Sequence, residues 1–300
     1  MNPILALIIA NIIWGAAAPI FKYSLTNIPP FTLAFLRFFI AALIFLPFIW
    51  RFNFRSLNRR EWTKTILASF FGITINISFF FMGLQRADSI NAPIIASSGP
   101  LFLFLLAVFF LHEKIKYRTL FGMFFSLLGV LVIVFLPILV EGKSMGKSAF
   151  EGNVMYIIAT LGAVLHPLLL KNELKKLSPY PIIFIGFIFA SFTFAPFMFN
   201  ELQLWSFSSL NSAGITGIIF GALFSSALAY FLFFYGLSKI AAQEVGIFTY
   251  IDPVVAILIA IPLVHEYPTL YFLIGSVLVF GGIYISEGRL HYHPFHRLRS

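Results

Sequence analysis

Long runs of apolar residues alternate along this chain with short polar segments. Each run is about 20 residues long, the length of helix that crosses the hydrocarbon core of a bilayer. The runs are continuous in Phe, Ile and Leu, whereas the strands of a membrane barrel would alternate with polar residues. The pattern predicts ten transmembrane helices, at roughly residues 3–22, 31–50, 64–84, 92–111, 119–140, 153–171, 181–199, 212–236, 244–264 and 269–286.

The composition supports an all-α integral membrane protein. Of the 300 residues, 60% are apolar and only 10% are charged, whereas about a quarter of the residues of a soluble domain are charged. The first run lacks the basic segment that precedes the core of a signal peptide, so we expect it to be a structural helix. The absence of cysteine excludes disulfides, thiolate metal sites and cysteine nucleophiles.

The two halves of the chain resemble each other at a constant offset of 153 residues. The matching pairs are Gly83 and Gly236, Pro100 and Pro253, Glu113 and Glu266, Gly122 and Gly275, and Gly129 and Gly282. Each half holds five predicted spans, and an odd number gives the halves opposite orientations in the membrane. The prediction is therefore two inverted five-helix repeats, the architecture of many secondary transporters. We place them at residues 1–145 and 146–288, joined by an exposed loop over 141–151.

The distribution of basic residues predicts the topology. Fifteen Lys and Arg residues fall in the even-numbered loops and the tail, against four in the odd-numbered loops. Because cytoplasmic loops accumulate Lys and Arg, we expect both termini to be cytoplasmic, with residues 289–300 as a basic cytoplasmic tail. The net charge of +9 is then explained by contact with anionic lipid headgroups and does not indicate a nucleic-acid partner.

Two passages identify a family by resemblance. The segment from Phe81-Met82-Gly83-Leu84 to Ser98-Gly99-Pro100, and again that from Tyr235-Gly236-Leu237 to Ile251-Asp252-Pro253, resembles the EamA repeat of the drug/metabolite transporter superfamily. Trp14-Gly15 and Arg37 look like the opening of that repeat. The second half has Leu161-Gly162 in place of Trp14-Gly15 and no obvious equivalent of Arg37, because its helix runs Ile185-Gly186-Phe187-Ile188. The resemblance implies ten helices in two inverted repeats, a central cavity, and export or exchange of small metabolites across the cytoplasmic membrane.

Charged residues inside predicted spans are candidates for substrate binding, because each costs about 2.5 to 3.5 kcal/mol to insert. Asp252 is expected about nine residues into its helix, beside Pro253, and Gly99 matches it in the first half. Arg37 could pair with Asp252, bind a substrate carboxylate, or extend along its helix toward the interface. If both charges face a cavity, they suit an amphoteric substrate such as an amino acid.

Further polar and aromatic residues complete the predicted substrate site. They are Trp14, His166, Asn11, Asn76 and Tyr230, each of which could instead be an interhelical contact or a packing residue. Glu113, Glu266, Pro100 and Pro253 are predicted to serve in gating or in helix capping. Gly217 and Gly221 predict close helix packing within the chain, with a homodimer surface as the alternative.

These features predict a secondary active transporter that exports a small amino-acid-like or amphipathic metabolite by alternating access, with coupling to protons as an option. The alternatives are an uptake or exchange carrier for a nucleotide-derived or amine metabolite, a channel and a membrane scaffold. An enzyme or an ATP-driven pump is not expected, because hydrolase motifs and a phosphate-binding loop are missing. No cofactor is expected, and the histidines of the tail lack the spacing of a metal site.

Overall fold

Helices form within every predicted apolar run. The computed structural model describes residues 1–99, 102, 117–140, 143–171, 173–174, 177–240 and 245–287, and this part of the chain contains no strand. The helices are α1 (Pro3–Ser24), α2 (Pro30–Ile49), η1 (Phe54–Ser56), α3 (Arg59–Ser69), η2 (Phe70–Ile75), α4 (Asn76–Leu84), α5 (Asn91–Ser97), α7 (Tyr117–Val140), α8 (Lys143–Leu170), α9 (Pro179–Glu201), η3 (Phe207–Ser209), α10 (Ser212–Ile219), η4 (Phe220–Leu228), α11 (Ala229–Lys239), η5 (Gly246–Tyr250), α13 (Ile251–Val264) and α14 (Leu270–Glu287).

Seven helices of the described residues are long and apolar enough to cross a membrane. Two of them, Arg59–Leu84 and Ser212–Lys239, are continuous but contain a π-helical segment, η2 in the first and η4 in the second. Two further apolar helices, Phe248–Val264 and Leu270–Ile285, are shorter. The chain is therefore a multi-pass membrane protein built from helices.

The segment expected to be a loop between the halves is mostly helical. Residues 141–142 lie outside the described residues, and α8 begins directly after them at Lys143. The prediction was based on the glycines, but Gly152 has a packing role. A Cβ atom on Gly152 would lie 2.6 Å from the Cβ atom of Ala87, so glycine lets α8 approach the end of α4 closely.

The ninth predicted span is helical throughout its described residues, 245–264, with the 3-10 turn η5 directly before α13. Asp252 is the second residue of α13 and the eighth of this helical stretch, close to the predicted depth. Pro253 follows it as the third residue of α13.

The two halves of the chain make corresponding helix contacts. In the first half, α1 packs against α11 and α13 of the second. In the second half, α8 packs against α4 and α5 of the first. The second helices of the two halves, α2 and α9, pack on each other, and so do the last, α7 and α14. When the halves are exchanged by the 153-residue offset, the α1–α11 contact matches the α4–α8 contact, and α5 matches η5, which also contacts α1. Helices α5 and α13 belong to the matching fourth and ninth predicted spans.

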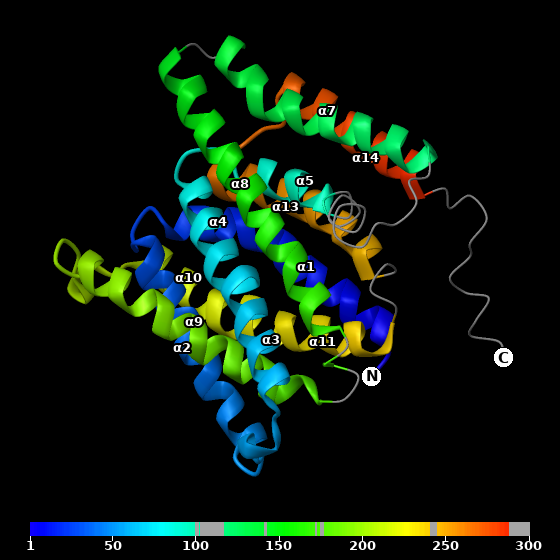
Figure 1. The fold of residues 1–300 in the computed structure, drawn as a ribbon. Coiled ribbons are helices and arrows are strands. Elements are labelled where there is room, and N and C mark those ends of the chain that lie inside the picture. The colour runs from blue at the N-terminus through cyan, green and yellow to red at the C-terminus, as the bar shows by residue number, and fades with distance from the viewer. Residues whose placement is uncertain are drawn as a thin grey trace.

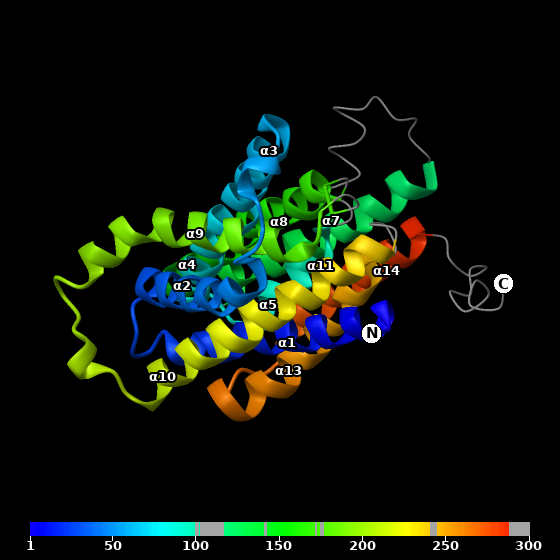
Figure 2. The ribbon, with the colours of Figure 1, turned by 90° about the horizontal axis from the view of Figure 1, so that it is seen from below.

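Helices α7 and α14 lie side by side at one edge of the molecule, as both views show (Figures 1 and 2). They cross through glycines, because a Cβ atom on Gly129 would lie 2.5 Å from the Gly275 carbonyl oxygen and one on Gly282 would lie 2.4 Å from that of Gly122. The Ser126 hydroxyl donates to the Val279 carbonyl at 2.8 Å between these two points. This pair is therefore held together by close backbone packing.

Polar contacts join the loops at one end of the helices, which we call the Lys64 end. Every contact there connects the N-terminus or a loop that follows an even number of predicted spans. The contacts are Lys64 with Glu173, Lys171 with the carbonyls of Leu237 and Ile240, and Tyr235 with the carbonyl of Met1.

A second set of contacts joins the loops at the opposite end, which we call the Lys22 end. These loops all follow an odd number of predicted spans. The contacts are Lys22 with Glu266, Arg86 with Glu151, Asn27 with the carbonyl of Ser209, and Glu201 with Phe31 and Thr32. The two sets therefore divide the loops in the way that successive crossings of a membrane would.

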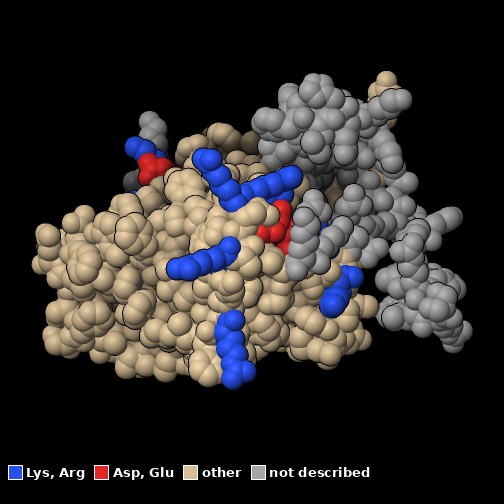
Figure 3. All heavy atoms as spheres, turned by 60° about the horizontal axis from the view of Figure 1, so that its bottom comes forward, with Lys and Arg blue, Asp and Glu red and all other residues tan. Residues whose placement is uncertain are grey.

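The surface between the two ends is apolar. Phe48, Phe192 and Val277 are 61%, 78% and 72% exposed, which is the arrangement of a protein solvated by lipid tails. Charged residues gather instead at the ends. Figure 3 shows Lys and Arg spread over the face that points down in Figure 1, with little Asp or Glu among them. The exposed arginines of the Lys64 end include Arg51, Arg55, Arg59 and Arg60.

Candidate functional site

Arg37 is the most deeply buried charged residue that the structure describes. It lies on α2, is 1% exposed, and meets η4 of the other half. Its Nε donates to the Ser226 hydroxyl at 2.9 Å and its Nη2 donates to the Ser225 hydroxyl at 3.0 Å. The rings of Phe21 and Phe38 cover the guanidinium, with centroids 4.6 and 4.7 Å from its central carbon. Arg37 therefore does not extend to the interface.

The charge of Arg37 has no counter-ion among the described residues. Its ion pair with Asp252, one of the sequence-based alternatives, does not form in this structure, and its Nη1 is buried without a hydrogen-bond partner. The serine hydroxyls accept some of the hydrogen bonds that the Arg37 guanidinium can donate, but they do not neutralise its charge. An uncompensated ion in a membrane interior is costly, which makes this position a functional candidate.

Trp14 and Tyr230 extend this centre into an aromatic cluster. The Trp14 indole Nε1 on α1 donates to the Ser225 carbonyl at 3.1 Å, so Ser225 contacts both Trp14 and Arg37. The Tyr230 ring on α11 meets the Trp14 ring edge-on at 5.4 Å and the Phe187 ring at 5.2 Å. The structure thus brings Trp14, Arg37 and Tyr230, three of the sequence-predicted site residues, together.

His166 joins the same cluster from α8. Its ring lies 6.1 Å from that of Tyr230 and 5.2 Å from that of Phe234, and the residue is 7% exposed. The imidazole packs on Gly72 of η2, where a Cβ atom would lie 2.2 Å from the His166 Cβ. A histidine at this place therefore depends on glycine in the π-helical segment.

The two predicted asparagines make different contacts. Asn76, at the start of α4, donates from Nδ2 to the Ala159 carbonyl at 2.8 Å and ties α4 to α8. Asn11, fully buried on α1, donates to the Leu7 carbonyl of its own helix at 2.8 Å, while its Oδ1 has no partner. Asn76 is thus an interhelical link, whereas Asn11 keeps a free acceptor.

Asp252 lies against α1. A Cβ atom on Gly15 would lie 2.7 Å from the Asp252 carbonyl oxygen, so the two backbones touch. The carboxylate Oδ1 of Asp252 is buried without a hydrogen-bond partner. Asp252 thus packs on α1 at Gly15, whereas Arg37 packs on the ring of Phe21 in the same helix.

Glu266 joins the two halves of the chain at the Lys22 end. Its Oε1 lies 2.5 Å from the Lys22 Nζ, and its Oε2 accepts from the Ser89 N–H at 2.7 Å, the Ser89 hydroxyl at 2.6 Å and the Ile90 N–H at 3.3 Å. These N–H groups directly precede α5, so Glu266 caps a helix of the other half. Pro100 and Glu113, the matching gating candidates of the first half, lie outside the described residues.

An unusual backbone conformation precedes Glu266. His265 has a φ of 55°, the one positive value among the non-glycine residues described, and it ends α13 in the left-handed region. A conformation of this kind costs of order 1 kcal/mol or more. The fold accepts this strain at the residue that directs Glu266 toward Lys22 and Ser89.

Ser225 and Ser226 belong to the centre but were missed in the sequence. They lie in η4, and the 153-residue offset matches residues 223–228 of η4 to 70–75, which are η2. Such π-helical segments frequently occur at functional sites. Two adjacent serines within an apolar run were the signal that could have indicated them.

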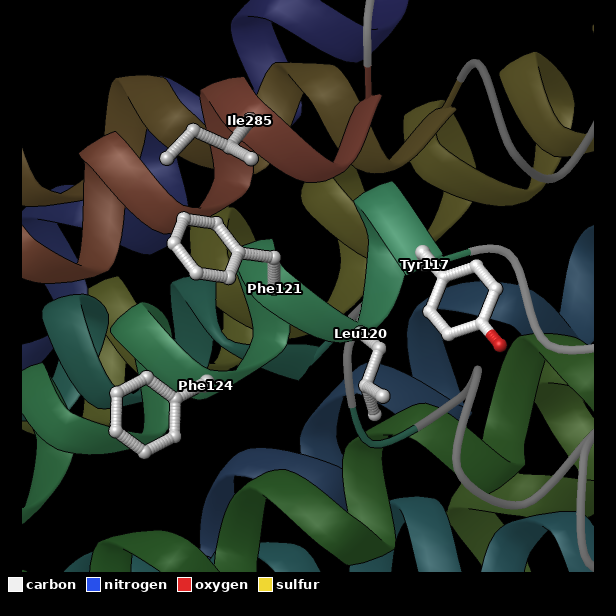
Figure 4. A pocket seen from close by; sticks show the side chains of 5 residues that line it. All are labelled: Tyr117, Leu120, Phe121, Phe124 and Ile285. Atoms are coloured by element: carbon white, nitrogen blue, oxygen red, sulfur yellow. The ribbon is translucent and has the colours of Figure 1, made fainter.

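The described residues also form a hollow away from this centre. It is lined by Tyr117, Leu120, Phe121, Phe124 and Ile285, on α7 and α14 (Figure 4). The lining is apolar apart from the tyrosine hydroxyl, and the residues belong to the exposed edge pair of helices. We interpret the hollow as part of the lipid-facing surface. No group of three His, Asp or Glu side chains that could hold a metal occurs in the described ranges.

Comparisons with known proteins agree with these features. The chain is 27% identical to the uncharacterized transporter YetK of Bacillus subtilis, over 95% of this chain and 87% of that protein. It is 28% identical to an uncharacterized transporter of Archaeoglobus fulgidus, over 91% and 94%. It is 25% identical to an S-adenosylmethionine uptake transporter of Rickettsia bellii, over 86% and 84%.

The fold is also known from a solved crystal structure. It matches over 99% of this chain and 98% of its own, with a TM-score of 0.63 at 19% identity. The profile of the EamA-like transporter family matches residues 1–135 and 150–287, nearly the whole chain. The chain belongs to the EamA-like transporter family.

Proposed function

We propose that the protein is a secondary active transporter that moves a small metabolite by alternating access between two inverted five-helix repeats. The observation that carries this proposal is the buried centre around Arg37, which lies where helices of both halves meet. Family membership already implies a small-molecule substrate and a place in the membrane. The proposal adds the repeat architecture, the site and the mechanism.

The contact pattern supports the inverted repeats. The contacts of α1 with α11 and η5 correspond to those of α8 with α4 and α5, as a twofold exchange of the halves requires. The glycines of α7 and α14 agree, because Gly122 faces Gly282 and Gly129 faces Gly275 while the sequence offset pairs Gly122 with Gly275. We propose repeats at residues 1–145 and 146–288 on this basis.

The division of loops between two ends supports the topology. The Lys64 end carries most of the described basic residues, so we propose that it faces the cytoplasm. Both termini would then be cytoplasmic, residues 289–300 would form a basic tail there, and anionic lipid headgroups would contact the arginines near α3. The Lys22 end would face outward.

We propose that Arg37, Trp14, Tyr230 and His166 contact the substrate, with Asn11, Asn76 and Asp252 at the margins of the site. The guanidinium is fully covered, so this conformation is closed around the centre. Movement of one helix bundle against the other would open it toward each end in turn. The free polar atoms of Asn11 and Asp252 support the inclusion of both residues.

We further propose that the contacts of Glu266 form the gate at the outward end. Glu266 belongs to the second half, whereas its partners Lys22, Ser89 and Ile90 belong to the first. Opening toward that end must separate the halves and break these contacts. We assign the short α5 and α13 helices, with Pro100 and Pro253, to the parts that move.

The direction of transport is proposed as export, with inward proton movement as the driving force. The second candidate is uptake of a nucleotide-derived metabolite, and the observation that favours it is the similarity to an S-adenosylmethionine uptake transporter. Both candidates use the same alternating-access cycle and differ in substrate and coupling.

Counterflow in proteoliposomes tests the proposal. Vesicles loaded with each of a panel of amino acids, nucleosides, polyamines and S-adenosylmethionine are measured with and without a pH gradient. We expect saturable exchange of at least one compound, and stimulation by a pH gradient if protons drive export. Voltage-driven current without saturable exchange would instead identify a channel, and inactivity toward every class would favour a scaffold.

A further inference from the structure

The buried centre carries a positive charge that the described residues do not balance. Two nitrogen atoms of Arg37 donate to neutral serine hydroxyls, and Nη1 has no partner. Leaving a buried ion without its opposite charge is strongly unfavourable. A ligand that brings a negative charge would remove that cost while it is bound.

The surroundings orient the guanidinium for such a ligand. Ser225 and Ser226 hold one edge of the planar group, and the rings of Phe21 and Phe38 cover it. The nitrogen left over is Nη1. A planar guanidinium whose donors are held in place suits a carboxylate better than it suits a neutral group.

The packing of the fold does not itself require this charge. Arg37 packs on Gly221 at the α2–η4 contact, where a Cβ atom on the glycine would lie 3.1 Å from the Arg37 Cβ. On the other side of the molecule α9 packs against the end of α3 and against η2. Gly186 faces Ser69 of α3 there, and a neutral hydrogen bond of 2.8 Å joins Thr74 of η2 to Thr193. One of two similar contacts is therefore cationic and the other is neutral.

We propose that Arg37, positioned by Ser225 and Ser226, binds a carboxylate of the transported metabolite. This inference rests on the proposed transport function and specifies the class of its substrate. The competing explanation is a purely structural cation that links α2 to η4, and the two make different predictions for selectivity.

The test compares carboxylic acids with their own amides. Counterflow is measured for amino acids and small mono- and dicarboxylic acids, each beside its amide, in the wild type and in Arg37→Gln, Ser225→Ala and Ser226→Ala. We expect the wild type to prefer the acids and Arg37→Gln to lower the ratio of acid to amide transport by at least about tenfold. The serine variants should raise KM for acids more than for amides.

Thr193→Val provides the matched control. It removes the hydrogen bond to Thr74 at the neutral contact and should leave the acid-to-amide ratio unchanged. If Arg37→Gln does not fold, the ratio in Ser226→Ala decides, together with the thermal stabilisation of the wild type by acids and by amides in detergent. If Arg37 has only a structural role, these variants should lose stability, but the acid-to-amide ratio should not change in transport or in thermal stabilisation.

Two results distinguish a failure of the carboxylate assignment from a failure of the proposed transport function. If the wild type exchanges amides, amines or neutral metabolites as well as the acids, or if Arg37→Gln keeps the acid preference, the carboxylate assignment is wrong and transport stands. If the wild type exchanges no compound of any class, the transport proposal fails as well.

Discussion

At the scale of single residues, the buried charges of this protein are treated in two ways. Glu266 is 8% exposed; its Oε1 forms an ion pair with Lys22, and its Oε2 accepts from the N–H groups before α5. Arg37 is more deeply buried, at 1% exposed, and has no counter-ion among the described residues. The first arrangement joins the two halves at the Lys22 end, whereas the second leaves a buried positive charge unpaired.

Glu266→Ala should destabilise the closed protein. It leaves Lys22 without its closest partner and the Ser89 and Ile90 N–H groups without an acceptor, so we expect a loss of about 3 kcal/mol. Thermal unfolding in detergent measures this loss. Glu151→Ala is the control, because Glu151 is 46% exposed and lies 3.9 Å from Arg86, and exposed pairs contribute less than about 1 kcal/mol. Equal effects of the two variants would contradict the gating contact.

At the scale of elements, neighbouring glycines in α14 have different roles. A Cβ atom on Gly282 would lie 2.4 Å from the Gly122 carbonyl oxygen, whereas one on Gly281 would meet nothing within 4 Å. Helix α14 can therefore tolerate an added methyl group at Gly281 but not at Gly282. Gly282 lies on the side of α14 that packs against α7.

Gly282→Ala should separate α7 from α14 and lower stability by about 1 to 3 kcal/mol, the usual cost of overpacking. Gly281→Ala should be neutral or stabilising by up to about 1 kcal/mol, because alanine favours the helix. Thermal unfolding of both variants in the same detergent provides the comparison. A Gly282→Ala protein as stable as the wild type would show that this crossing is not tightly packed.

The positions of these elements follow from the sequence better than their internal geometry does. Runs of about 20 apolar residues predict where helices lie, because an unpaired backbone in lipid is too costly. The early start of α8 was missed, since Gly152 looks like a loop residue until Ala87 is seen against it. The π-helical segments η2 and η4 were missed because they depend on packing with other helices.

The site was predictable to a similar degree. Charge inside an apolar run indicated Arg37 and Asp252, and the offset between the halves indicated Glu266. The partners of Arg37 were not predictable, because Ser225 and Ser226 lie 188 and 189 positions further along the sequence. Serine hydroxyls are common in membrane helices, so their presence alone identifies no contact.

At the scale of the whole molecule, the topology can be tested directly because the chain has no cysteine. A single cysteine at Ser56, in the exposed turn η1 of the Lys64 end, should react with a membrane-impermeant thiol reagent only from the cytoplasmic side. One at Ser208, in the exposed turn η3 of the Lys22 end, should react only from outside. Labelling of both from the same side would contradict the proposed crossings.

The unequal contacts at the centre have a consequence for anything carried through it. Arg37 binds hydroxyl groups of η4 on one side, whereas a neutral hydrogen bond between Thr74 and Thr193 joins η2 to α9 on the other. A site formed by two identical halves would bind a substrate in two opposite orientations with the same affinity. A single cation on one side makes the two orientations unequal in energy. If Arg37 binds a carboxylate as proposed, the substrate should keep that group next to η4 throughout the transport cycle. It would then leave the site with the carboxylate in front in one direction and behind in the other.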